Sequence, residues 1–490
     1  MKNSSTRTMT AKRIAVAVSA VCATMSAPSF AAGDDMKALM DLLLKKGVIT
    51  QQEYDQNIQA AKDAAENKAF KEKRLSDDVT KLNNMALKNK DTGQVMKNGL
   101  GIQSADGKNS IKFIGRVHMD YRSFSSDATG FDGYQDLMQI RRARAGFEGI
   151  FLKDFDYKLF MDIGTTAGMA STTTTMDEGY IGYSYNSSLK FRAGKFKMPF
   201  SLEQLTSSNN IDFMERSLGG QIEGELVPAK EVGAMVFGAP MKGTTYAAAL
   251  SQGTLAKTAA FNKPDFIGRV TANLSTLADR KDEVSHIGLA YSTGEIPSIA
   301  SGGIESGRTE AREASKFFDS TVTVDGGATR TREGIELAYA MGPVKVQAEQ
   351  MKVKYDNVTS SDFSYKSNYV QAVWNITGEN HNYSDSSGTF GWIKPKSQFS
   401  SSGGGTGAVQ VGLRYSAFDA SGITAPSGRT NGANALTYGV TWFMNDNVRL
   451  LLNYVVTNFD SPITITNSGA ATGSAVNKQE AVIVRGQVSF

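Results

Sequence analysis

The chain has very little cysteine and no long apolar segment that would serve as a membrane helix. Its 490 residues include one cysteine, Cys22, so no internal disulfide can form. Beyond the first thirty residues, no apolar run approaches the roughly 18 residues that a membrane-spanning helix needs. Proline occurs only 10 times, and the composition excludes both a collagen-like and a disordered chain.

The chain also lacks a large excess of positive or negative charge. Lysine and arginine total 53 and aspartate and glutamate 49, which gives a formal net charge of +4. A general attraction for nucleic acid is therefore not expected. Any preference for anions must come from where the charges lie.

The amino terminus has the pattern of a secretory signal peptide. Basic residues up to Arg13 precede an apolar stretch from Ile14 to Met25, and small residues follow at Ser29 and Ala31. We predict that residues 1–31 are removed, with Cys22, on export. The mature chain then has no thiol and a formal charge near zero.

Residues 32–92 are predicted to be helical. Apolar residues recur at intervals of three and four from Met36 to Leu44, and Thr50 and Glu53 form a capping-box pattern. Leu75, Val79 and Leu82 continue a short heptad-like seam. Residues 36–90 are therefore expected to form a coiled coil that contacts periplasmic partners or helps trimer formation, or else a solvated linker.

From residue 93 to residue 490 the sequence alternates between apolar and polar residues. Around Phe147, for example, Ala143 and Ala145 share one face of a strand with Phe147, while Arg142 and Arg144 share the other. The pattern persists to the terminal residue, Phe490. Together with the export signal, it predicts an all-β protein: a transmembrane antiparallel β-barrel of about 16 strands in contact with membrane lipid.

The polar face must point into the barrel, because an arginine facing lipid at the midplane costs roughly 2 to 4 kcal/mol. Arg116, Arg142, Arg144 and Arg269 are thus expected on the inner wall. Asp120, Glu148 and Asp162 share this face, so the wall is alternatively a salt-bridged one around a weakly selective general pore.

No pattern for catalysis or metal binding stands out. His118, His286 and His381 lack metal-ligand spacing, and neither a phosphate-binding glycine loop nor a nucleophile elbow is present. Neither an enzymatic activity nor a cofactor is expected. Three Gly-, Ser- and Thr-rich runs are predicted to be exterior loops: Ser298–Gly307, Ser400–Gly407 and Thr464–Ser474.

Several segments resemble the phosphate- and polyphosphate-selective porins of Gram-negative outer membranes. The resemblance is carried by Arg141–Gly149, Lys190–Glu203 and Met214–Leu218, and spans about Gly99 to Phe490. It implies a homotrimer of 16-stranded barrels in the outer membrane. In such proteins a ladder of arginines passes anions through a constriction formed by inward-folded loops.

The resemblance also implies roles for individual residues. Arg116, Arg141, Arg142 and Arg216 fall at ladder and constriction positions, and Asp177 falls at the acidic member of the phosphate site. Gln204 departs from the pattern, because the phosphate-selective members have a clamping lysine there. Arg144 and Lys197 replace aromatic residues, so positive charge has moved along the pore. The resemblance therefore implies anion transport without strict phosphate specificity.

We conclude from the sequence that the chain is an outer-membrane porin through which small anions such as phosphate diffuse. The candidate pathway residues are Arg116, Arg141, Arg142, Arg144, Asp177, Lys197, Gln204, Arg216 and Arg269. The alternative from another class is an exported surface or envelope-tethering protein without a pore.

Overall fold

The computed structural model describes most of the chain beyond residue 100. The described ranges are 94–95, 100–127, 136–163, 174–222, 224–253, 263–296, 307–312, 316–319, 327–358, 361–465 and 474–490, with scattered positions between 41 and 77. The predicted signal peptide lies outside the described residues, as do Leu75, Val79 and Leu82 of the predicted heptad-like seam.

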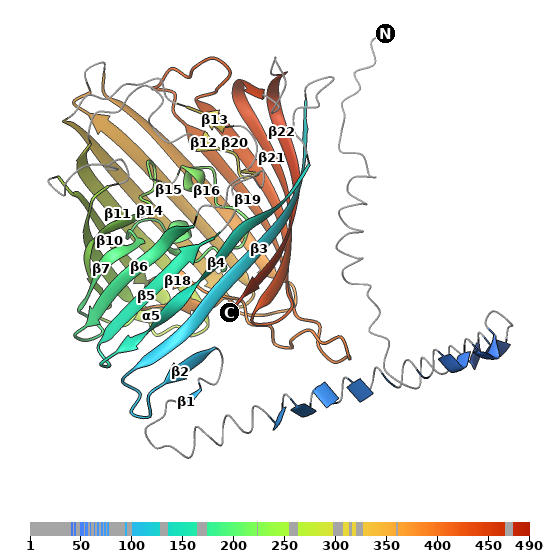
Figure 1. Cartoon of the computed structure of the whole chain (residues 1–490). Coiled ribbons are helices and arrows are strands. Elements are labelled where there is room, and N and C mark those ends of the chain that lie inside the picture. Colours follow the sequence, from blue (N-terminus) through green and yellow to red (C-terminus); the bar gives the residue numbers. More distant parts are fainter. Residues whose placement is uncertain are drawn as a thin grey trace, which may run out of the picture.

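Sixteen antiparallel strands form a closed barrel, which confirms the predicted fold class and strand number (Figure 1). The strands of the wall are β3 (Ser110–Ser126), β4 (Leu137–Phe151), β5 (Phe155–Asp162), β6 (Thr175–Ser184), β7 (Lys190–Lys197), β8 (Lys230–Gly238), β9 (Thr244–Ser251), β10 (Asp265–Asn273), β11 (Glu283–Ile296), β14 (Ala328–Met341), β15 (Val344–Asp356), β16 (Phe363–Asn375), β19 (Ala408–Asp419), β20 (Gly432–Phe443), β21 (Val448–Ile465) and β22 (Ser474–Ser489). Each strand pairs with the next, and β22 pairs with β3, where Val484 lies opposite Tyr121. Two short strands, β1 (Gln94–Val95) and β2 (Gly101–Gln103), extend the sheet at the start of β3.

Inward and outward side chains alternate along the wall as the sequence predicts. In β16, Tyr365 and Tyr369 are buried inside, whereas Val370 and Trp374 are about half exposed on the outer face. Arg142 and Arg269 are each 5% exposed on the inner side. The cost of placing arginine in lipid thus determines which face of each strand points into the barrel.

The two rims of the barrel differ in the length of their connections. One rim has mainly short ones, such as residues 152–154, 185–189, 342–343 and 444–447, and a connection that contains α5 (Leu274–Leu277). Longer connections, such as 198–229 and 297–327, join strands at the other rim. In outer-membrane barrels the short turns are periplasmic and the longer loops are extracellular. The carboxyl-terminal Phe490 therefore lies at the periplasmic rim.

The extracellular connection between β7 and β8 folds into the barrel. It contains α4 (Leu202–Leu205) and the 3-10 turn η1 (Gly219–Gln221), and Met198, Phe200 and Leu218 in it are fully buried. The Glu349 carboxylate on β15 accepts the backbone N–H groups of Leu202 at 2.9 Å and of Glu203 at 2.7 Å. This carboxylate thus pins the first turn of α4 to the wall.

A second extracellular connection also reaches inward, between β12 (Gly307–Arg308) and β13 (Lys316–Phe318). The Glu310 carboxylate accepts hydrogen bonds from Arg414 at 3.0 Å and from Ser416 at 2.5 Å, both on β19. Since Glu310 is only 2% exposed, this connection is anchored inside the barrel.

One periplasmic connection, residues 376–407, is long and also folds into the barrel. It carries the hairpin of β17 (Tyr383–Ser384) and β18 (Thr389–Phe390), and the Gly388 carbonyl accepts a hydrogen bond from Arg269 at 3.0 Å. Gly388 has a φ of +61°, and a Cβ there would lie 2.7 Å from the Thr271 hydroxyl oxygen, so only glycine fits. The prediction of an exterior loop at Ser400–Gly407 is wrong, because this run leads from the hairpin into β19 at the periplasmic rim.

The described positions between 41 and 77 are helical apart from Thr50, as predicted. The Tyr54 hydroxyl donates a hydrogen bond to Asp41 at 2.5 Å. No helix among the described residues combines the length and the apolar character needed to cross a membrane.

Candidate functional site

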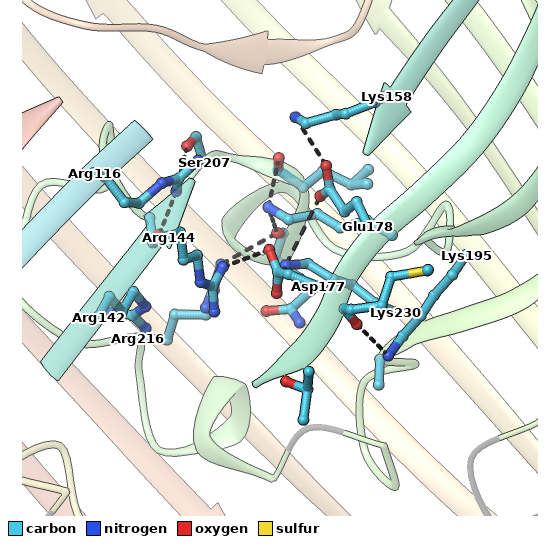
Figure 2. Close-up of a pocket in the computed structure, with 17 residues that line it drawn as sticks. Arg116, Arg142, Arg144, Lys158, Asp177, Glu178, Lys195, Ser207, Arg216 and Lys230 are labelled. Carbon is cyan, nitrogen blue, oxygen red and sulfur yellow. Dashed lines mark hydrogen bonds and ion pairs between the residues drawn. The ribbon is translucent and has the colours of Figure 1, made fainter. Parts of the chain in front are cut away.

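A cavity of about 440 Å³ lies between the inner wall of β3 to β8 and the inward connection of residues 198–229. We call it the cationic cavity, because eight cationic and two acidic side chains line it. Its charged and hydroxyl-bearing residues are Arg116, Arg142, Arg144, Lys158, Thr175, Asp177, Glu178, Lys195, Lys197, Ser207, Ser208, Arg216 and Lys230. The four arginines gather on one side, and Lys195 and Lys230 lie on the other (Figure 2).

The two carboxylates of the cavity are already paired with cations. Asp177 accepts a hydrogen bond from Arg144 at 2.7 Å and also contacts Lys230, and Lys158 lies 2.9 Å from Glu178. Arg144 has a second partner in Asp162 at 2.8 Å. The predicted salt-bridged wall is thus present on this side, where Arg144 is held between two carboxylates.

Lys197 and Arg216 are occupied by backbone carbonyl groups at the end of α4. The Lys197 ammonium donates to the carbonyls of Gln204 at 2.7 Å, Leu205 at 3.1 Å and Thr206 at 3.1 Å. Arg216 donates to the Gln204 carbonyl at 3.3 Å. An ammonium has three donors, so Lys197 has none left for an anion, although its charge stays in the cavity.

Among the described residues, Arg116 has no carboxylate within ion-pair distance, and Arg142 has only a distant one. Arg116 donates to the hydroxyls of Ser208 at 2.9 Å and Ser207 at 3.4 Å, and its guanidinium lies over the Phe160 ring. Arg142 lies 3.8 Å from the nearest oxygen of Glu215. Since hydroxyls accept these hydrogen bonds, the charge of Arg116 remains uncompensated.

Glu215 lies behind the cavity in the inward connection. It accepts a hydrogen bond from Arg141 at 2.8 Å and another from Arg485 at 2.8 Å. Burial alone would raise the pKa of Glu215, but the surrounding guanidinium groups, Arg141 and Arg485 foremost, hold it well below its usual value. This carboxylate therefore remains charged and ties the connection to the wall.

Most of the residues predicted for the pathway meet in the cationic cavity. The seven that line it are Arg116, Arg142, Arg144, Asp177, Lys197, Gln204 and Arg216. Arg141 lies beside it on Glu215, and Arg269 lies elsewhere, with its guanidinium on Glu336 at 2.7 Å and on the Gly388 carbonyl. Other residues also line the cavity and were not among the predicted pathway residues; they include Lys158, Glu178, Lys195, Ser207, Ser208 and Lys230.

Two irregularities in strand register explain part of this difference. A shift between β3 and β4 at His118 and Met119 lets both Arg141 and Arg142 reach Glu215 on the inner side. A second shift, between β5 and β6 at Phe160 and Met161, lets both Asp177 and Glu178 face the cavity. Such bulges redirect side chains, and strict alternation cannot predict them.

The closed barrel, its inward-folded connections and its charged inner cavity define a channel-forming protein of the porin class. The family model for phosphate-selective porin O and P matches residues 111–489. The chain therefore belongs to this family, and the predicted resemblance is confirmed.

Among its relatives is Porin O of Pseudomonas aeruginosa, which is 27% identical over 401 residues, covering 76% of this chain and 87% of that protein. Among solved structures, in-vitro folded OmpT of Vibrio cholerae has a TM-score of 0.48 at 12% identity, covering 81% of this chain and 100% of that chain. The outer-membrane channel DcaP of Acinetobacter baumannii has a TM-score of 0.46 at 11% identity, with the same coverage.

Family membership confirms the prediction of an outer-membrane porin in a Gram-negative bacterium. Family membership also excludes the alternative of an exported surface or envelope-tethering protein without a pore. The family and the fold indicate a channel rather than an enzyme.

Proposed function

We propose that the cationic cavity is the selective part of the pore and that small anions diffuse through it without chemical change. The observation that carries this proposal is the lining of eight cations and two acids. After the two carboxylates are paired, Arg116, Arg142 and Lys195 still offer positive charge to the pathway. An anion that passes meets fixed cations, and a cation meets their repulsion.

The magnitude is sufficient to favour anions. Two unit charges about 4 Å apart interact by roughly 4 kcal/mol at an effective dielectric constant of about 20, which offsets part of the cost of removing water from the ion. Arginine suits this task because its planar donors stay charged at any relevant pH. Conduction also requires release, and the open cavity offers several weak contacts in place of one closed binding site.

The hydroxyls of Ser207 and Ser208 complete the proposed anion path. Both oxygens accept hydrogen bonds from Arg116, so their hydrogens are free to turn toward an anion. Phosphate is among the anions we expect to pass, in line with the family. Strict phosphate specificity is not proposed, because the three donors of Lys197 are bound to carbonyls and Arg144 lies between two carboxylates.

The test is the reversal potential of single channels in a planar bilayer under a potassium chloride gradient. We expect anion preference in the wild type and a smaller preference in Arg116→Ala and in Arg142→Ala. Arg280→Ala is the matched control, because Arg280 is half exposed on a periplasmic turn and its loss removes the same charge outside the cavity. Cation preference in the wild type, or unchanged preference in both cavity variants, contradicts the proposal.

We also propose that the chain forms homotrimers through the outer face of β5 to β10. These strands have only 8 to 10 residues, whereas the wall strands β14, β15, β16 and β19 to β22 have 12 to 18. A tilted strand of 8 residues spans roughly 20 Å, less than the apolar band of about 25 Å on outer-membrane barrels. A groove of about 640 Å³ on this face, with Ala193, Ala234 and Ala248 in it, leaves room for another subunit.

The mass of the assembly in detergent, measured by analytical ultracentrifugation, tests this interface. Ala234→Trp fills the groove and should release monomers. Ala348→Trp, on the outer face of the longer strand β15, is the control and should leave the trimer intact. Monomers in the wild type, or trimers in Ala234→Trp, would refute the proposed interface.

A further inference from the structure

Two unpaired polar atoms of opposite kind belong to residues that line the cationic cavity. The side-chain oxygen Oε1 of Gln204 is buried and accepts no hydrogen bond within the described part of the chain. The Nε–H group of Arg116 is likewise buried and donates none there. Gln204 is 2% exposed, and a buried polar group without a partner is costly.

The Gln204 amide differs in one respect from every cationic side chain of the cavity. Ammonium and guanidinium groups only donate hydrogen bonds, whereas an amide also accepts them through its oxygen. The two cavity carboxylates have acceptors too, but these are engaged by Arg144, Lys230 and Lys158. The terminal amide torsion is broad, so the Gln204 oxygen can turn toward a ligand.

We propose that Gln204 makes the pore favour oxyanions that carry their own hydrogen-bond donor over oxyanions of the same shape and charge that carry none. The ligand class is a protonated oxyanion, with inorganic hydrogen phosphate as the simplest example. Its unprotonated oxygens pair with Arg116 and the serine hydroxyls, and its P–OH group donates to Gln204 Oε1. This inference rests on the proposed anion path and adds a selection within it.

Sulfate is the matched probe. At mildly alkaline pH both phosphate and sulfate are tetrahedral and mainly dianionic, but only phosphate retains a hydroxyl. One added hydrogen bond to an otherwise unpaired acceptor is expected to make phosphate block chloride current at about three- to tenfold lower concentration than sulfate. Both ions are titrated into single-channel chloride recordings of the wild-type protein.

Gln204→Met keeps the length of the side chain and removes its acceptor. We expect the two blocking concentrations to become equal in this variant, while Gln398→Met, at an exposed position of the periplasmic connection, keeps the wild-type ratio. Arg116→Lys should weaken the block by both ions together, because it loses the planar donors and leaves the acceptor in place.

The inference is overturned if phosphate and sulfate block the wild type equally, if Gln204→Met keeps their ratio, or if Arg116→Lys abolishes it. The open chloride conductance of Gln204→Met shows whether its pore has formed correctly. The reversal potential tests the underlying anion path separately, so a pore that prefers anions but does not distinguish the two oxyanions refutes only this inference.

Discussion

Replacing Gln204 with lysine should convert a weak phosphate site into a strong one. The backbone of Gln204 is already fixed, because its carbonyl accepts hydrogen bonds from Lys197 at 2.7 Å and Arg216 at 3.3 Å. Lysine at this position would add a ninth cation to the cavity, and the present donors of Lys197 would stay on the carbonyls.

The size of the effect follows from the hydrogen bond that the new ammonium gains. A hydrogen bond to a charged group contributes about 1.5 to 3 kcal/mol net, which corresponds to roughly a tenfold to hundredfold tighter block. Repulsion from the eight existing cations raises the cost of adding this charge to the empty pore, and a bound phosphate relieves it. Both effects favour binding in the variant.

The assay is chloride conductance titrated with phosphate in the wild type and in Gln204→Lys. Gln398→Lys adds the same charge outside the cavity and should leave the wild-type block unchanged. The lysine should also reduce the preference for phosphate over sulfate, since an ammonium donates to both ions and accepts from neither. Tight block already in the wild type, or no tightening in Gln204→Lys, would refute the reasoning.

Three further predictions follow from the contacts of the inward connection and from the amino-terminal segment. Lys197→Met leaves three carbonyls at the end of α4 without their ammonium partner, so we expect larger current fluctuations in single-channel recordings than in Arg116→Ala; a quiet pore would contradict this. The pKa of Glu215 is lower in the folded protein than in the unfolded chain, so its contribution to stability is present above the unfolded pKa and is lost only as pH falls through the folded pKa. The melting temperature should therefore hold from neutral to mildly acid pH. A steep fall of the melting temperature in that range would refute the assignment. Deleting residues 36–90 should leave single-channel conductance unchanged, because no described residue of this segment lines the cationic cavity; a large change would show that the segment enters the pore.

The wall of the barrel was predictable because one physical cost acts on every strand. Lipid excludes arginine from the outer face, so alternation alone places Arg116 and Arg269 inside and leaves Val117 and Val270 outside. The strand number followed from the length of the alternating region. The sequence pattern is periodic wherever this constraint applies.

The inward connections were harder to predict, because no lipid boundary imposes a period on them. Phe200 and Leu218 are as buried as any residue of the wall, yet their spacing follows neither strand nor helix. The partners of a cation are equally hard to predict. Arg269 faces inward as Arg142 does, but it is bound by Glu336 and by the Gly388 carbonyl, which is distant in sequence. Contacts between segments far apart in the chain decided which cations line the cavity.

The periplasmic connection that folds into the barrel has an electrical consequence. Phe390 of its hairpin packs in one buried cluster with Leu202 of α4 in the extracellular connection. The two inward connections therefore support each other inside the barrel. Deleting the hairpin of residues 383–390 should alter the current of the open pore in two ways, because it removes the hairpin itself and also takes away a contact that holds α4.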